Sequence, residues 1–130
     1  IPGRANRHLD KGRVVIFAAG TGNPFFTTDT AAALRAAEIN AEKLCMAKFG
    51  TDGVYDKDPR EHIDAVKFPR MTHQQYLNQN LGVLDMTAVA HCQQTKTPII
   101  VFDMDEPGSV TSVLTGQGEA EYTEIVPGLV

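Results

Sequence analysis

The sequence has little of what builds disulfide frameworks, nucleic-acid interfaces or metal sites. It holds only two cysteines, Cys45 and Cys92, and both lie in apolar segments, so we expect two buried thiols rather than a disulfide. Its 12 Lys and Arg are outnumbered by 16 Asp and Glu, and we therefore expect neither nucleic acid nor a membrane surface as a partner. The four histidines, His8, His62, His73 and His91, share no metal-ligand spacing, so we expect no resident metal site.

Long hydrophobic runs are also missing. No apolar stretch approaches the roughly 20 residues of a transmembrane helix, and no leader-like segment opens the chain, so we expect a cytoplasmic protein. Hydrophobic residues at 42% and charged residues at 22% are ordinary for a globular domain. A chain of 130 residues is long enough to bury one core, and we expect a single domain over residues 1–130.

The most informative stretch is a polar, glycine-bearing loop between an apolar run and a helical pattern. The unbroken apolar character of residues 14–18 predicts a strand buried on both faces. The alanine-rich pattern of residues 30–40 predicts a helix. Between them lies GTGNPFFTTD, residues 20–29. Because ligands of α/β proteins bind where strands end, and the free amides of a helix start attract anions, we predict an anion or nucleotide site here.

Asp29, beside the start of that helix, has two interpretations. It could be an N-cap, since Asp, Ser and Thr dominate that position. Thr27, Thr28 and Thr30 would cap equally well, however, so the carboxylate adds a charge where a hydroxyl would suffice. Near a phosphate, a carboxylate usually orients a lysine or a metal ion. The residues alone leave both roles open.

The rest of the chain continues the alternation of strands and helices, which is typical of the α/β class. A strand, a helix and a second strand over residues 14–47 would form a right-handed crossover unit of a parallel sheet. The other expected strands are residues 98–102 and 121–126, with a short extended piece at 67–69. The other expected helices are residues 4–11, 71–78, 109–114 and a helix that Asp85 opens.

Residues 20–29 resemble the uridylate-binding loop of bacterial uridylate kinases, in the amino-acid kinase superfamily. Ten consecutive residues of this kind are a specific signal. The resemblance covers nearly all of the chain but only the carboxyl-terminal half of such a kinase, so we expect a carboxyl-terminal portion that opens at Ile1-Pro2-Gly3. It implies a three-layer αβα sandwich with a mainly parallel sheet.

The resemblance also implies roles for individual residues. The residues that would bind UMP are Thr21, Gly22, Asn23, Pro24, Phe25, Phe26, Thr27 and Thr28. Asp29 would hold a catalytic lysine and the metal ion in register, and Asp85 would act near the phosphates unless it is only a helix cap. Residues 51–59 resemble the ATP-site segment, in which Tyr55 and Asp58 flank the donor nucleotide. The plain alternative for that segment is a surface turn with one packed tyrosine.

The implied activity is phosphoryl transfer from ATP, with Mg²⁺, to UMP, giving UDP and ADP in pyrimidine biosynthesis. The resemblance further implies a homohexamer with GTP or UTP as effectors. The catalytic lysine of the family lies in the amino-terminal half, so we expect this chain alone to be inactive. Phe49 stands where relatives carry a polar residue that contacts ATP, which puts donor binding in question. The alternatives are a non-catalytic nucleotide- or anion-binding member of the superfamily and a scaffold.

Overall fold

The computed structural model describes residues 2–128, and within them the chain forms helices and strands that alternate along the sequence. The helices are α1 (Pro2–Leu9), α2 (Thr28–Glu38), α3 (His73–Gln79), α4 (Met86–Thr95) and α5 (Ser109–Thr115). The strands are β1 (Leu44–Lys48), β2 (Val54–Tyr55), β3 (Lys67–Phe68), β4 (Arg70–Thr72), β5 (Ile99–Asp103) and β6 (Tyr122–Val126).

The central sheet has the strand order β1-β5-β6-β4. Strand β1 runs parallel to β5, with Met46 opposite Val101, and β4 runs parallel to β6, with Thr72 opposite Val126. Only the pairing of β5 with β6 is antiparallel. The sheet is therefore mainly parallel, as predicted. Among residues 2–128 no strand pairs with the outer edge of β1.

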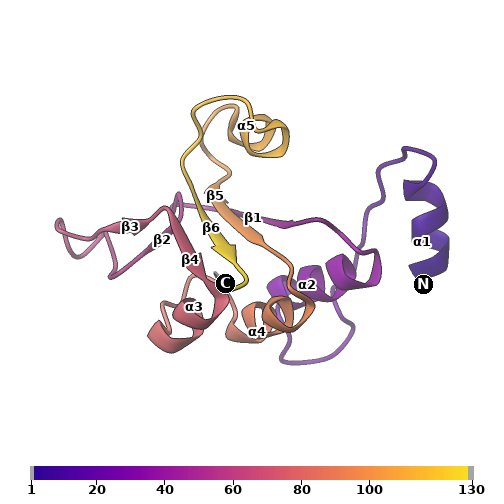
Figure 1. Ribbon diagram of the computed structural model, residues 1–130, viewed down its shortest axis with the longest axis horizontal. Coiled ribbons are helices and arrows are strands. Elements are labelled where there is room, and N and C mark those ends of the chain that lie inside the picture. The colour runs from indigo at the N-terminus through magenta and orange to yellow at the C-terminus, as the bar shows by residue number, and fades with distance from the viewer. Residues whose placement is uncertain (1, 129–130) are drawn as a thin grey trace.

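Helices cover both faces of this sheet, which confirms the predicted three layers (Figure 1). Successive residues of a strand point to opposite faces. In β5, Ile99 and Val101 belong to the core under α2, α3 and α4, whereas Ile100 and Phe102 pack with Val113 of α5. Each such side chain, fully buried, contributes about 1.5–3 kcal/mol to folding. A buried strand of this kind explains the unbroken apolar run in the sequence.

Strands β2 and β3 form a small antiparallel ribbon beside the sheet. Thr123 of β6 fixes this ribbon, because its buried hydroxyl accepts a hydrogen bond from the Val54 N–H at 2.8 Å and donates to the Phe68 carbonyl at 2.6 Å. The loop that follows β1 and leads into the ribbon is thereby held at the carboxyl end of the sheet.

Side-chain caps explain where two helices begin. Thr72 and Gln75 form a capping box at the start of α3, with both reciprocal hydrogen bonds present. The helix expected over residues 71–78 therefore begins at His73, and Arg70–Thr72 forms the short strand β4 instead. Asp85 is the N-cap of α4 and accepts a hydrogen bond from the Thr87 N–H. The prediction that Asp85 opens a helix is confirmed.

The strand predicted over residues 14–18 is not formed. Val14 is 92% and Ile16 88% exposed in an irregular segment. An apolar run becomes a strand only where a neighbouring strand satisfies its backbone groups, and no described strand pairs with this one. Phe17 alone faces a hollow beside α2 and Leu44. The crossover unit expected over residues 14–47 is therefore reduced to α2 and β1.

The two thiols are free and differ in burial. Cys92 lies on α4 and is fully buried in the core, and this burial raises its pKa to about 11. Cys45 is only half-buried, and desolvation raises its pKa as well, against the opposing effect of Lys43. The expectation of buried thiols is confirmed for Cys92 and holds in part for Cys45. No helix within residues 2–128 combines the length and the apolar character needed to cross a membrane.

Candidate functional site

The loop predicted to bind UMP lies on the surface and leads directly into α2. Gly20 and Gly22 adopt positive φ angles of 62° and 76°, which glycine tolerates and most residues do not. Phe25 has a φ of 67°, an unusual conformation for a bulky residue, and its ring is fully exposed. Thr21 turns the chain by accepting a hydrogen bond from the Asn23 N–H at 3.0 Å. The loop thus presents aromatic and polar side chains to solvent.

Asp29 lies in the first turn of α2, where its carboxylate meets a lysine. The ammonium of Lys48, the last residue of β1, donates to both carboxylate oxygens at 3.0 and 2.9 Å. The backbone N–H of Asp85 donates to the same carboxylate at 3.2 Å. The N-cap position of α2 is Thr27, so Asp29 is not the cap of this helix. Its charge is directed at Lys48 instead.

Asp85 connects the starts of two helices. Its carboxylate caps α4 and also accepts hydrogen bonds from the hydroxyls of Thr27 and Thr30, both at 2.9 Å. Desolvation opposes ionisation of this carboxyl, but the hydroxyls of Thr27 and Thr30 and the N–H of Thr87 outweigh it and lower the pKa of Asp85. Asp85 is therefore a carboxylate at neutral pH.

These contacts join Thr27, Asp29, Thr30, Lys48 and Asp85 into one cluster, which we name the junction network. Its members come from the start of α2, the end of β1 and the start of α4. It contains two carboxylates and one ammonium. The structure thus brings together both predicted catalytic carboxylates, although 56 positions separate them along the chain.

Lys48 was not predicted as a site residue from the sequence, because the resemblance assigned the lysine partner of Asp29 to the amino-terminal half. A usable signal was its position. Lysine at the carboxyl end of a predicted strand lies where α/β proteins place their ligands.

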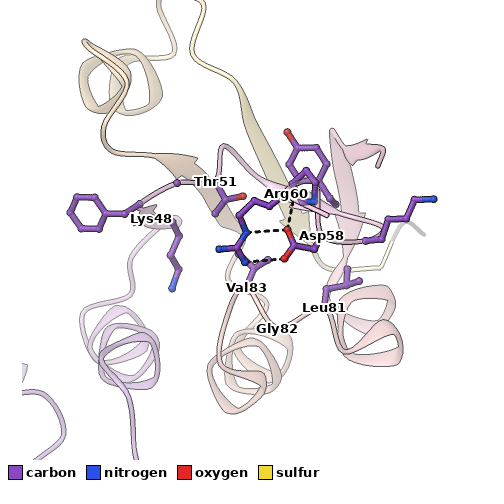
Figure 2. Close-up of a pocket in the computed structure, with 12 residues that line it drawn as sticks. Lys48, Thr51, Asp58, Arg60, Leu81, Gly82 and Val83 are labelled. Atoms are coloured by element: carbon purple, nitrogen blue, oxygen red, sulfur yellow. Dashed lines mark hydrogen bonds and ion pairs between the residues drawn. The ribbon is translucent and has the colours of Figure 1, made fainter. Parts of the chain in front are cut away.

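Lys48 of the junction network is one of the residues that line a cavity of about 300 Å³ (Figure 2). Both residues predicted to bind ATP, Tyr55 and Asp58, line it, and so does Lys48. The remaining lining residues are Phe49, Gly50, Thr51, Lys57, Pro59, Arg60, Leu81, Gly82 and Val83. We call this hollow the Tyr55 cavity. Since Lys48 borders both, the network and the cavity are continuous.

Ion pairs and hydrogen bonds shape the wall of the Tyr55 cavity. Arg60 donates to Asp58 from its backbone N–H at 2.9 Å and from its guanidinium at 3.1 and 2.9 Å, as the dashed lines in Figure 2 show. These Arg60 hydrogen bonds lower the pKa of Asp58. The Tyr55 hydroxyl donates to Asp52 at 2.6 Å, which raises the pKa of Tyr55. Phe49, at 72% exposed, adds an open aromatic ring to the rim.

The predicted site residues thus fall into three neighbouring groups. Tyr55 and Asp58 lie in the cavity, and Thr27, Asp29 and Asp85 lie in the junction network. Residues 21–26 lie in the exposed loop before α2, and Thr28 borders the separate hollow that Phe17 faces. Chemically, the arrangement offers an exposed polar loop, a hydrogen-bonded cluster of charges and an open cavity.

Comparison with known proteins decides the family. The profile of the amino acid kinase family matches residues 2–103. The chain belongs to the amino acid kinase family. Among the curated relatives, the uridylate kinase of Oenococcus oeni is 53% identical over 117 residues, which are 90% of this chain and 48% of that protein. The uridylate kinase of Rubrobacter xylanophilus is 59% identical over 114 residues, 88% of this chain and 45% of that protein.

Solved structures of the family share the fold. The UMP kinase of Ureaplasma parvum matches with a TM-score of 0.88 and 40% identity, over 97% of this chain and 53% of that one. The UMP kinase of Bacillus anthracis matches with a TM-score of 0.91 and 36% identity, over 99% of this chain and 52% of that one. The resemblance and the fold class predicted from the sequence are confirmed. This family member spans about half the length of the relatives it matches.

Proposed function

We propose that the whole protein is a uridylate kinase, which transfers a phosphoryl group from ATP to UMP and releases UDP and ADP. One observation carries the proposal: the Asp29–Lys48 pair links the end of the uridylate-type loop to the Tyr55 cavity. Phosphoryl transfer depends on two phosphates held in line and on stabilised charge rather than on covalent chemistry. A fixed charge cluster between two nucleotide sites suits that task.

On the acceptor side, we assign UMP to the loop of residues 21–28. The side chains of Thr21, Asn23 and Thr28 supply hydrogen bonds, and the rings of Phe25 and Phe26 shape the pocket. Both rings are exposed, at 103% and 51%, which supports an aromatic surface that a ligand covers. The amides at the start of α2 favour the negative charge of the monophosphate.

On the donor side, we assign ATP to the Tyr55 cavity. Tyr55 and Asp58 line it, together with Leu81, Gly82 and Val83. Arg60, whose side chain is 82% exposed and is bound to Asp58, adds positive charge beside the space for a triphosphate. Lys48 lies where this cavity meets the junction network.

Mg²⁺ is the cofactor that we propose, in company with ATP. Among residues 2–128 no group of three or more His, Cys, Asp or Glu side chains forms a metal cage. Mg²⁺ does not need such a cage, because it is usually held by one or two carboxylates together with substrate phosphates. Asp29 and Asp85 are the carboxylates that would hold it. When bound, the ion neutralises phosphate charge, while Asp29 and Lys48 keep the surrounding charges fixed.

By the same resemblance we propose a cytoplasmic homohexamer in pyrimidine biosynthesis that responds to GTP and UTP. Light scattering coupled to size exclusion, with and without each nucleotide, tests the assembly. A monomer under all conditions would contradict it.

The function is tested by ADP release from the whole protein with UMP, CMP or AMP as acceptor. We expect UMP to give the highest kcat/KM, because the loop matches the uridylate type. CMP or AMP as the better acceptor would overturn the assignment. The isolated chain serves as the control and should show no turnover, since the family's catalytic lysine lies outside it.

A non-catalytic nucleotide-binding protein is the second candidate, and the exposed Phe49 on the rim of the cavity is the observation that favours it. The same assay separates the two. Nucleotide binding in calorimetry without any release of ADP from the whole protein would select the binding protein.

A further inference from the structure

Lys48 is the cation that pairs with Asp29 beside the Tyr55 cavity. It ends β1, at the point where the chain turns toward the Tyr55 cavity. Its side chain is 23% exposed and that of Asp29 is 16% exposed, so solvent screens their interaction only partly. Both oxygens of Asp29 accept from the one ammonium, at 3.0 and 2.9 Å.

The Asp29 carboxylate is fully oriented by this arrangement. Besides the two contacts to Lys48, it accepts the backbone N–H of Asp85 at 3.2 Å. Three hydrogen bonds from two donor groups, the Lys48 ammonium at the end of β1 and the Asp85 N–H at the start of α4, therefore fix a side chain that belongs to α2. Without Lys48, the single remaining donor would leave the carboxylate free to turn.

The charge balance points in the same direction. The junction network holds the two carboxylates of Asp29 and Asp85, and Lys48 supplies its one ammonium. Phosphates that approached two uncompensated carboxylates would be repelled. Lys48 offsets one of the negative charges at the point where both nucleotide sites meet.

We propose that Lys48 is a positioning residue for phosphoryl transfer, which fixes the Asp29 carboxylate between the two nucleotide sites and balances its charge. The inference rests on the proposed function and adds to it a residue that acts through Asp29. A purely structural ion pair of this exposure would stabilise the fold slightly and leave turnover unchanged.

The chain offers a matched control in Arg35. Its guanidinium donates to both oxygens of Glu38 at 2.9 and 3.0 Å, and the two side chains are 28% and 25% exposed. This pair lies on α2, as Asp29 does, but it does not border the Tyr55 cavity. Arg35→Met therefore removes a similar ion pair from the same helix without touching the junction network.

The experiment measures kcat, the KM values for UMP and ATP, and the thermal midpoint in the whole protein. We expect Lys48→Met to lower kcat by about tenfold or more, with the KM for UMP changed by less than about threefold. Lys48→Arg should recover most of the lost kcat, because a guanidinium also grips a carboxylate with two hydrogen bonds. Arg35→Met should keep kcat within about twofold of the wild type.

A double-mutant cycle with Asp29→Asn decides whether Lys48 acts through Asp29. If it does, Lys48→Met should lower kcat by less than about twofold in the Asp29→Asn background. Independent effects that multiply in the double variant would overturn the positioning role. So would a Lys48→Met protein whose kcat lies within about twofold of the wild type.

If Lys48→Met does not fold, Lys48→Gln takes its place in the cycle, and failure of both to fold would make Lys48 structural and overturn the proposal. A wild-type protein that phosphorylates no nucleoside monophosphate would overturn the proposed function and this inference together. An active wild type with unchanged Lys48 variants would overturn this inference alone.

Discussion

At the scale of single residues, the carboxylate of Asp29 is the charge that we expect to matter most for turnover. Asp29→Asn in the whole protein removes the partner of Lys48 while it keeps the side-chain shape. We expect kcat to fall by about a hundredfold, corresponding to about 3 kcal/mol for one preorganised electrostatic element, and the KM for UMP to change much less.

Steady-state kinetics and the thermal midpoint of the Asp29→Asn protein provide the measurement. A variant of normal stability with near-normal kcat would contradict the catalytic role. The helix start would not account for a loss of activity, since Thr27 rather than Asp29 occupies the N-cap of α2.

Asp85 should make folding stability depend on pH. Its pKa in the folded chain is lowered, so its contribution is present above the ordinary pKa of about 3.9 and is lost as the pH falls through the folded value. We expect the difference in free energy of unfolding between the isolated wild-type chain and Asp85→Ala to be constant near neutral pH and to shrink below about pH 4. Urea unfolding at several pH values measures it, and a pH-independent difference would contradict the lowered pKa.

The two cysteines should react at different rates. Cys92 is fully buried with a pKa of about 11, so at pH 8 only about one thiol in a thousand is the reactive thiolate. We expect a maleimide reagent to label half-buried Cys45 first and to label Cys92 only after denaturation. Mass spectrometry of peptides from the native protein identifies the labelled site. Equal labelling rates of Cys92 in the native and denatured chain would show that it is not buried.

At the scale of elements, the exposed apolar segment of residues 14–17 should make the isolated chain self-associate. Val14 and Ile16 are almost fully exposed, and the neighbouring edge of β1 has no partner among the described strands. We expect the double substitution Val14→Lys and Ile16→Lys to lower self-association and to change stability by no more than about 0.5 kcal/mol. Light scattering against concentration measures the first and urea unfolding the second. Unchanged scattering would mean that other surfaces drive association.

The sequence predicted best those elements whose signals are local. The apolar run of β5 and the capping residue Asp85 led to elements that the structure confirms. Strand β4 was missed because its three residues, Arg70–Thr72, have no pattern of their own and are strand only through their pairing with β6. The strand predicted over residues 14–18 failed for the converse reason, since its pattern is right but its partner is missing.

The residues of the candidate site could largely be predicted from the sequence, but the contacts between them could not. The loop sequence identified residues 20–29, and the Tyr55 segment was found in the same way. The pairing of Lys48 with Asp29 spans 19 positions, and that of Asp85 with Thr27 spans 58. Such contacts depend on how α2, β1 and α4 meet around the sheet, which no local pattern encodes.

At the scale of the whole molecule, β6 holds the sheet together, because it pairs with both β5 and β4. A chain that ends at residue 118 would lose β6 and leave the buried side chains of Ile99 and Met71 without their neighbour Ile125. We expect this truncated chain to lose cooperative unfolding, whereas the isolated full chain unfolds in one transition. Circular dichroism during urea unfolding measures this, and a truncated chain with a sharp transition would contradict the central role of β6.

The place of β6 also sets an order of events during synthesis. The strand that the ribosome releases last among those described lies inside the sheet rather than at its edge, between β5 and β4. Until residues 122–126 emerge, the facing sides of β4 and β5 have nothing to pair with. While the segment between β5 and β6 is being synthesised, the growing chain must therefore keep two unpaired strand edges apart, and the sheet closes only once β6 has emerged.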